Sequence, residues 1–356
     1  MWIRTLPVYS KLAEAEQVPP EVAQRLHGWQ LSQHQVETYQ ALTKGDAEVI
    51  FNTAMTGDGK SLAAYLPALV RPGYHAFGMY PTIELSRDQA RQFENYATHF
   101  QVALSYCPLW GAELSRLAEH EFGRRGDALK ERFTNHQVIM TNPDIFNLVM
   151  NYRYGSWIFS DQELPYSLCT NFDSFIFDEF HVFAMPQVVA AVTAMLYMHE
   201  YYPGQHRFLF ASATPSDVLI DMVQRSGLRS RTISGTYTHS MEPGHRLVLH
   251  PATLDLQRLG ERQTTEDWLR EHLQDLVAFW REQSPRPKAA VIVNSVVAAR
   301  RIARMLEQEL HSAGISVGEN TGLTDAERRR ISLEKDLVVG TSTIDVGVDF
   351  DVNLLI

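Results

Sequence analysis

The chain has 356 residues, of which 45% are hydrophobic and 21% are charged, and its formal net charge is −10. These values are typical of an ordinary globular protein with two domains, and the negative charge excludes a global field that would attract nucleic acid. The two cysteines lie far apart and outside any C-x-x-C pattern, which excludes a disulfide framework and a zinc knuckle.

Targeting signals are not evident in the sequence. The N-terminus lacks the apolar stretch of a secretory signal. The longest mostly apolar run, at residues 188–198, is too short to span a bilayer and predicts a buried helix. We therefore expect a cytoplasmic protein with no membrane partner.

Apolar strand-like runs alternate with helical segments in the first part of the chain. The expected strands are 47–54, 74–82, 136–144, 172–180 and 206–215, and the expected helices include 61–70 and 84–100. Buried strands that alternate with helices predict a parallel α/β sheet, whose ligands bind beyond the carboxyl ends of the strands. Polar clusters fall at those ends.

A segment rich in Gly, Ser, Thr and Pro at 226–252 separates this pattern from a second one. We place the boundary near residue 235, which gives an N-terminal domain 1–235 and a C-terminal domain 236–356. In the second domain we expect helices at 264–283 and 296–314 and strands at 288–295, 335–342 and 352–356. A domain that ends in a buried strand with no helix to cover it looks cut short.

The run AMTGDGKS at residues 54–61 lies between an expected strand and an expected helix. It matches the phosphate-binding pattern G-x-x-x-x-G-K-[ST], except that alanine stands at the first glycine. A phosphate cradle needs converging backbone N–H groups at a helix N-terminus and a cation. The candidate nucleotide-binding residues are therefore Thr56, Gly57, Asp58, Gly59, Lys60 and Ser61. The alternative is a glycine turn that only starts a helix.

The run FDSFIFDEFH is an apolar strand that ends in two carboxylates. A site that hydrolyses nucleotides needs one carboxylate at the metal and another near the attacking water, and Asp178 and Glu179 suit these two roles. Together with the hydroxyl of Ser61, Asp178 is the candidate Mg²⁺ ligand. The alternative is a buried strand with a solvated acidic end.

The order of the motifs AMTGDGKS, PTIEL, TNPD, DEFH and SAT resembles the first motor domain of superfamily 2 helicases of the DExH kind. The resemblance implies two RecA-like domains that bind ATP and Mg²⁺, and in that family alanine is often found at the position of Ala54. The implied catalytic residues are Lys60, Asp178, Glu179 and His181. The implied coupling residues, which His181 would contact, are Ser212, Ala213 and Thr214.

Further positions follow from the same resemblance. Gln35 matches an adenine-reading glutamine, and its alternative is an ordinary glutamine on a surface helix. The implied contacts to nucleic acid are Pro81, Thr82 and Thr141 in the first domain and Asn294, Ser295 and Thr341 in the second. Threonines at such places also cap helices, which is the alternative. Near ATP, the segment LVVGTSTIDVGVDFD would contribute Asp345, Gly347 and Asp349.

Within this family the sequence most resembles the stand-alone helicase subunit of type I-D CRISPR systems. The resemblance implies 3′-to-5′ movement on single-stranded DNA in antiviral interference. The implied partners are an effector complex with guide RNA and a separate subunit with an HD nuclease. The sequence has no His-Asp dipeptide and no H-E-x-x-H motif, so we expect no nuclease site in this chain.

The arginine-rich motif Q-R-x-G-R, which follows in related motors, is not found after residue 341. Arginine fingers of this kind are worth roughly a thousandfold or more in rate. We therefore expect weak ATP binding with slow hydrolysis from these residues alone. The alternatives are a DExH RNA helicase and a truncated module that binds ATP and DNA with little turnover.

Overall fold

The computed structural model describes residues 1–45, 47–154, 163–214, 217–283, 285–341 and 352–356. The chain divides into two compact units. The larger unit is Arg4–Thr253, and the smaller is Leu254–Ile356 together with Met1–Ile3. None of the described helices has the length and apolar character needed to cross a bilayer.

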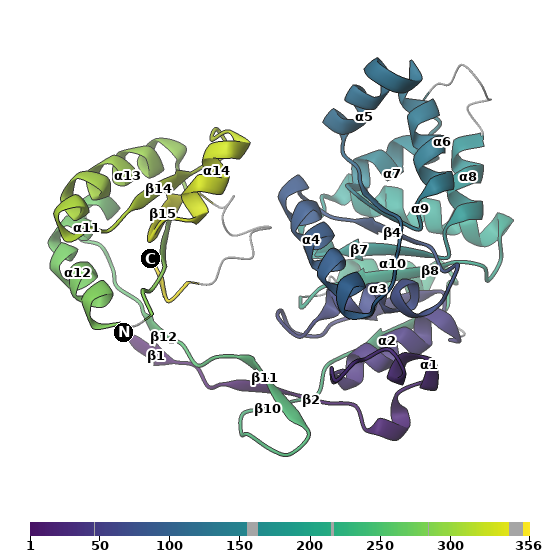
Figure 1. Ribbon diagram of the computed structural model, residues 1–356, viewed down its shortest axis with the longest axis horizontal. Coiled ribbons are helices and arrows are strands. Elements are labelled where there is room, and N and C mark those ends of the chain that lie inside the picture. The colour runs from purple at the N-terminus through teal and green to yellow at the C-terminus, as the bar shows by residue number, and fades with distance from the viewer. Residues whose placement is uncertain (46, 155–162, 215–216, 284, 342–351) are drawn as a thin grey trace. The chain divides into compact units, whose positions relative to one another are not determined.

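In the described part of the larger unit, a seven-stranded parallel sheet forms the centre (Figure 1). Its strands, in spatial order, are β5 (Tyr106–Pro108), β6 (Val138–Thr141), β4 (Ala76–Met79), β7 (Ser174–Asp178), β8 (Arg207–Ala211), β3 (Val49–Asn52) and β9 (Ser230–Ile233). The expected parallel α/β sheet is confirmed.

Two hydrophobic cores cover the two faces of this sheet. Successive side chains of a strand point to opposite faces. Phe175 and Phe177 of β7 accordingly lie in one core, and Ile176 lies in the other. Because both faces are buried, the strand is a continuous apolar run, as parallel sheets require.

The helices divide between these cores. The core that contains Phe177 is completed by α5 (Gly111–Leu117), α6 (Arg125–Asn135), α7 (Pro143–Met150), α8 (Glu163–Asn171), α9 (Met185–Tyr201) and α10 (Asp217–Arg225). The core that contains Ile176 is completed by α1 (Pro20–Ala23), α2 (Gln33–Thr43), α3 (Lys60–Val70) and α4 (Ile83–His99).

A row of phenylalanines fixes three neighbouring strands of this sheet against one another. Phe177 and Phe210 are register partners whose rings stack at 4.5 Å, and Phe210 also stacks on Phe51 at 5.5 Å. Stacked aromatic pairs stabilise a sheet by more than the burial of their apolar area alone provides. The row therefore holds β7, β8 and β3 in register just before their carboxyl ends.

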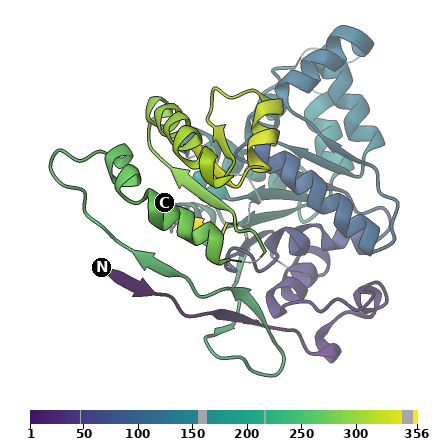
Figure 2. The same cartoon turned by 60° about the vertical axis from the view of Figure 1, so that its left-hand side comes forward.

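A second, three-stranded antiparallel sheet joins the start of this unit to its end. Its central strand is β2 (Val8–Lys11), flanked by β10 (Tyr237–Thr238) and β11 (His245–Leu249). Figure 2 shows this pairing as the purple N-terminal chain beside green strands. Because of it, the larger unit extends to Thr253. The boundary near residue 235 stays a prediction about domains.

The smaller unit carries its own parallel sheet, in the order β14 (Val317–Asn320), β15 (Leu337–Gly340), β13 (Ala289–Ile292) and β16 (Leu354–Leu355). Its helices are α11 (Thr265–Glu271), α12 (Leu273–Glu282), α13 (Val296–Leu310) and α14 (Ala326–Leu333). The prediction of one helix over 264–283 was wrong. The helix is interrupted at His272, whose backbone (φ −103°, ψ 14°) leaves the helical region.

Gly78 on β4 is required by the packing of α3. A Cβ at this position would collide with the hydroxyl of Tyr65, which is itself bonded to the hydroxyl of Tyr80 inside the core. We expect Gly78→Ala to lower the free energy of unfolding by roughly 1–3 kcal/mol, as overpacking does. Denaturant titration measures this change. Gly111→Ala is the matched control, because a Cβ there meets open space. An equal loss in both variants would contradict the packing argument.

Candidate nucleotide-binding site

Three of the predicted motifs lie at one edge of the seven-stranded sheet. The glycine loop follows β3, Asp178 ends β7, and Ser212 follows β8, and these strands are neighbours in the order β7-β8-β3. Because all three strands are parallel, their carboxyl ends meet at the same edge. Segments far apart in sequence thus form one cluster.

The glycine loop has the geometry of a phosphate cradle. Gly57 (φ +83°) and Gly59 (φ +81°) adopt left-handed conformations that side chains disfavour, and α3 begins directly after Gly59. The buried Lys60 donates from Nζ to the carbonyl oxygen of Ala54 at 3.0 Å. Ala54 is fully buried, and its φ is not positive, so the backbone requires no glycine there.

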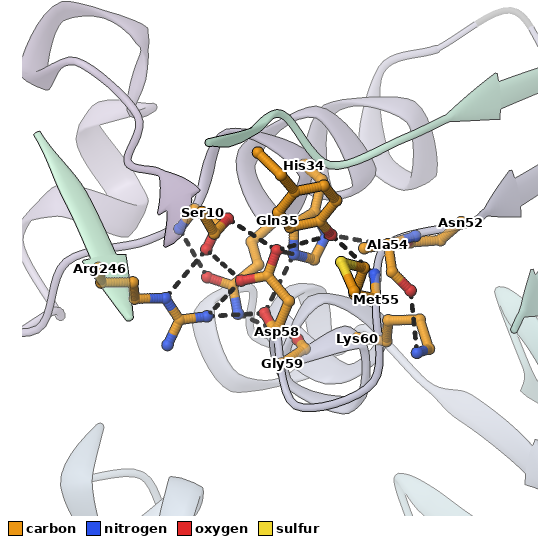
Figure 3. Close-up of polar contacts among 12 residues, drawn as sticks. Ser10, His34, Gln35, Asn52, Ala54, Met55, Asp58, Gly59, Lys60 and Arg246 are labelled. Atoms are coloured by element: carbon orange, nitrogen blue, oxygen red, sulfur yellow. Dashed lines mark hydrogen bonds and ion pairs between the residues drawn. The ribbon is translucent and has the colours of Figure 1, made fainter. Parts of the chain in front are cut away.

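The remaining loop positions differ in exposure. Thr56 is exposed, and Ser61 is half-buried in the first turn of α3. The side chain of Asp58 is fully buried, and the role of this residue in nucleotide binding stays a prediction. Its carboxylate accepts hydrogen bonds from Ser10, Ser32, Tyr237 and Arg246. These protein contacts occupy both of its oxygens (Figure 3).

Asp58 stays ionised in this buried place. Burial alone raises the pKa of its carboxyl, but contacts with His34, Ser10 and Ser32 outweigh that effect and hold the pKa well below its usual range. A buried carboxylate is tolerated only when it is paired and bonded in this way.

Gln35 is buried within α2 and does not lie on the surface. Its Oε1 accepts from the backbone N–H of Ser32 at 2.8 Å, and its Nε2 donates to the carbonyl of Gly59 at 3.0 Å. A glutamine amide has a second hydrogen and a second lone pair beyond these. The role of Gln35 in reading adenine stays a prediction.

The two expected carboxylates have different environments. Asp178 is buried, and burial, together with the adjacent Glu179, raises its pKa to about 7, while Lys60 acts in the opposite direction. Glu179 is half-buried, and its N–H donates to Oδ1 of Asp178 at 3.0 Å. Its φ of +47° is unusual for a residue with a side chain. Strained backbone of this kind clusters at functional sites.

The predicted contact between His181 and the Ser-Ala-Thr motif is confirmed. Nδ1 of His181 lies 2.8 Å from Oγ of Ser212 and 3.1 Å from Oε2 of Glu179. Ser212 also donates to the carbonyl of Thr214, next to the half-buried Ala213. These contacts link the Glu179 carboxylate to the end of β8.

The expected nucleic-acid residues of the larger unit lie at the ends of neighbouring strands β4 and β6. Thr82, after Pro81, caps α4 by accepting from the N–H of Leu85. Thr82 therefore does act as a helix cap, which was the alternative. Thr141 is buried, and among the described residues its hydroxyl has no hydrogen-bond partner. Asn142 caps α7 in its place.

The smaller unit shows a similar placement. Asn294 is exposed and Ser295 caps α13, both just beyond β13. Thr341 follows the neighbouring strand β15 and is mostly buried. The predicted residues Asp345, Gly347 and Asp349 lie outside the described residues.

Sequence reasoning missed three residues of the site: Ser10, Tyr237 and Arg246. Arg246 donates from Nη2 to the carbonyl oxygen of Asp58 at 2.7 Å and to its Oδ1 at 2.8 Å. The hydroxyl of Tyr237 accepts from the N–H of Met55 at 2.7 Å. No local motif marks these residues, because they reach the loop only through the pairing of β2 with β10 and β11.

Comparison with known structures shows the fold. The chain matches the DNA-bound DUF1998 helicase MrfA with a TM-score of 0.73 at 16% identity, over 100% of this chain and 49% of that one. It matches Mss116p bound to ssRNA and AMP-PNP with a TM-score of 0.65 at 13% identity, over 95% and 66%. It matches Saccharomyces cerevisiae Dbp5 bound to RNA and ADP BeF3 with a TM-score of 0.61 at 14% identity, over 96% and 78%.

The chain thus spans about half the length of MrfA. The expected fold class, parallel α/β units of the RecA-like kind, is confirmed by these likenesses. No curated protein matches the sequence. The family model for DEAD/DEAH box helicases matches residues 32–222, which include the glycine loop, the Asp178–His181 segment and the Ser-Ala-Thr motif. The chain therefore belongs to the DEAD/DEAH box helicase family.

Proposed function

We propose that this chain binds Mg·ATP at the edge formed by β7, β8 and β3 and uses its hydrolysis to move along single-stranded DNA. One observation carries the proposal. The buried Lys60 at the start of α3 and the buried Asp178, which come from distant parts of the sequence, lie at the carboxyl ends of β3 and β7 in the neighbouring order β7-β8-β3. A cation beside a carboxylate at the start of a helix is the arrangement that nucleotide phosphates with a metal require.

Each residue has a role in this proposal. Lys60 and the backbone N–H groups at the start of α3 would hold the β- and γ-phosphates. Glu179 would accept a proton from the attacking water, and His181 would hold the Glu179 side chain by its 3.1 Å contact. Because His181 also contacts Ser212, a change in the position of His181 when nucleotide binds would move the residues at the end of β8.

The oxygen donors of Ser61 and Asp178 fit Mg²⁺. Magnesium prefers few protein ligands, one or two of them carboxylates, and takes the rest from water and phosphate. A cation at the buried Asp178 carboxyl would favour its charged form and so lower the pKa that burial raises. When bound, the ion supplies positive charge to the phosphate oxygens.

The nucleic acid is proposed as DNA, with 3′-to-5′ movement, on the resemblance to type I-D CRISPR helicases. MrfA, a helicase of like fold, was solved with DNA. The proposed partners are an effector complex with guide RNA and a separate HD-nuclease subunit. RNA is the second candidate, because Mss116p and Dbp5 of like fold were solved with RNA. Contacts to phosphate cannot choose between the two polymers.

Stimulation of ATP hydrolysis separates these candidates. We expect single-stranded DNA to raise the ATPase rate of this chain several-fold more than RNA of the same sequence. We also expect a duplex with a 3′ tail, and not one with a 5′ tail, to be unwound. Stimulation by RNA alone would make the chain an RNA helicase. Binding of ATP and DNA without turnover would favour the binding module.

A further inference from the structure

Three residues in one row of the antiparallel sheet bind the same loop residue. In the sheet β10-β2-β11, Tyr237 and Arg246 are the register partners of Ser10 on either side. Cross-strand neighbours in register point to the same face. All three donate to the Asp58 carboxylate: Ser10 at 2.7 Å, Arg246 at 2.8 Å and Tyr237 at 3.0 Å.

The contacts reach the loop backbone as well as the Asp58 side chain. The carbonyl of Asp58 accepts from Arg246 at 2.7 Å and lies 3.0 Å from Nε2 of His34. The next carbonyl, that of Gly59, accepts from Gln35 at 3.0 Å. Figure 3 shows Arg246 approaching the loop from β11, on the opposite side from Lys60.

These contacts determine where the loop amides point. In a trans peptide the C=O and the following N–H point in opposite directions. With the carbonyls of Asp58 and Gly59 fixed toward Arg246 and α2, the N–H groups of Gly59 and Lys60 point away from them. Among the described residues, these two N–H groups have no protein acceptor. They are thus left for an anion at the start of α3.

We propose that Arg246, with Ser10 and Tyr237, is a positioning residue for the phosphate-binding loop, which makes nucleotide affinity depend on the strands β10 and β11. The proposal rests on the proposed function of the loop. It adds residues outside the predicted motifs on which the nucleotide affinity would depend. Residues 237–249 lead directly into the smaller unit, which begins at Leu254. The last strands of the larger unit therefore help to build the nucleotide site.

The test is the affinity for a fluorescent N-methylanthraniloyl derivative of ADP with Mg²⁺. Arg246→Ala should weaken binding about tenfold, and raise the KM for ATP more than it lowers kcat. Arg246→Lys should recover part of the affinity, because an ammonium keeps the charge but cannot fork between the carbonyl and the carboxylate of Asp58. Tyr237→Phe should have a smaller effect, because it removes one hydroxyl, which contacts the Asp58 carboxylate and the N–H of Met55, and leaves both Arg246 contacts in place.

Arg225→Ala is the matched control. Arg225 is an exposed arginine of α10, paired with Asp221 away from the loop, and its loss should change affinity less than twofold. The affinities of all variants are measured below their melting temperatures, so that unfolding does not contribute to the differences. Unchanged affinity in Arg246→Ala, or a loss no larger than that of the Arg225→Ala control, would overturn the proposal. If the unmodified chain does not bind the probe, the proposed function itself fails, and this inference fails with it.

Discussion

Lys60→Met is expected to reduce ATP hydrolysis by at least about a hundredfold, the size of effect seen when one preorganised charge donor is removed. Methionine keeps the apolar stem of the buried lysine but deletes the ammonium. Nothing else in the loop supplies that charge, because Lys60 is the one cationic side chain of residues 54–61. Steady-state ATPase measurement in the presence of single-stranded DNA gives the result.

The control for this change is Lys44→Ala. Lys44 is exposed at the end of α2 and pairs with Glu21 on the surface, so its loss should leave the rate within twofold. The melting temperature of Lys60→Met shows whether the loop still folds. A folded Lys60→Met variant with normal turnover would remove Lys60 from the catalytic residues and contradict the proposed site.

Asp178→Asn is expected to remove ATP hydrolysis to a similar degree and yet stabilise the free protein at alkaline pH. The asparagine oxygen can still accept the hydrogen bond from the N–H of Glu179. However, an amide neither binds Mg²⁺ as a carboxylate does nor carries a buried charge. A variant that is both inactive and more stable is typical of a functional group held at a cost to folding.

The sign of the pH dependence follows from the two pKa values. The pKa of Asp178 is raised to about 7 in the folded chain from the ordinary 3.8. Between these values the folded state holds a proton that the unfolded state has lost, so the free energy of unfolding falls as pH rises. At one pKa unit per about 1.4 kcal/mol, the advantage of Asp178→Asn should grow by roughly 1–2 kcal/mol from pH 5.5 to pH 8.5.

Denaturant titrations without nucleotide and with EDTA measure this advantage. Asp221→Asn is the control, because Asp221 lies on the surface of α10 beside Arg225. It should leave the pH profile of stability unchanged. A constant difference between Asp178→Asn and the unmodified chain at all pH values would show that Asp178 does not titrate in this range.

Strands and loop chemistry could be predicted because their signals are local. A run such as SFIFD can only be buried on both faces, and glycines before a lysine need no distant partner to form a turn. The same holds for Asp178 and Glu179, which follow their strand directly. The contact of His181 with Ser212 was predicted only through the resemblance of the motifs to a family.

Other parts of the site could not be predicted because they depend on long-range pairing. Asp58 looks like a polar loop residue open to a ligand. Its burial follows from Ser10, Tyr237 and Arg246, which the antiparallel sheet brings from both ends of the larger unit. The break at His272 is a similar case. The apolar period of 264–283 continues across it, and tertiary packing decides where the helix ends.

The placement of β2 between β10 and β11 has a consequence for the time at which the protein becomes competent to bind nucleotide. A ribosome makes the glycine loop early and reaches Arg246 only after another stretch of synthesis, at roughly 5–20 residues per second. Until then β2 lacks its partner β11, and the carbonyls of Asp58 and Gly59 have the contacts from His34 and Gln35 without that from Arg246. A nascent chain that has made its central strands but not β11 should therefore bind ATP poorly. The row of Tyr237, Ser10 and Arg246 would delay tight nucleotide binding until the larger unit is complete.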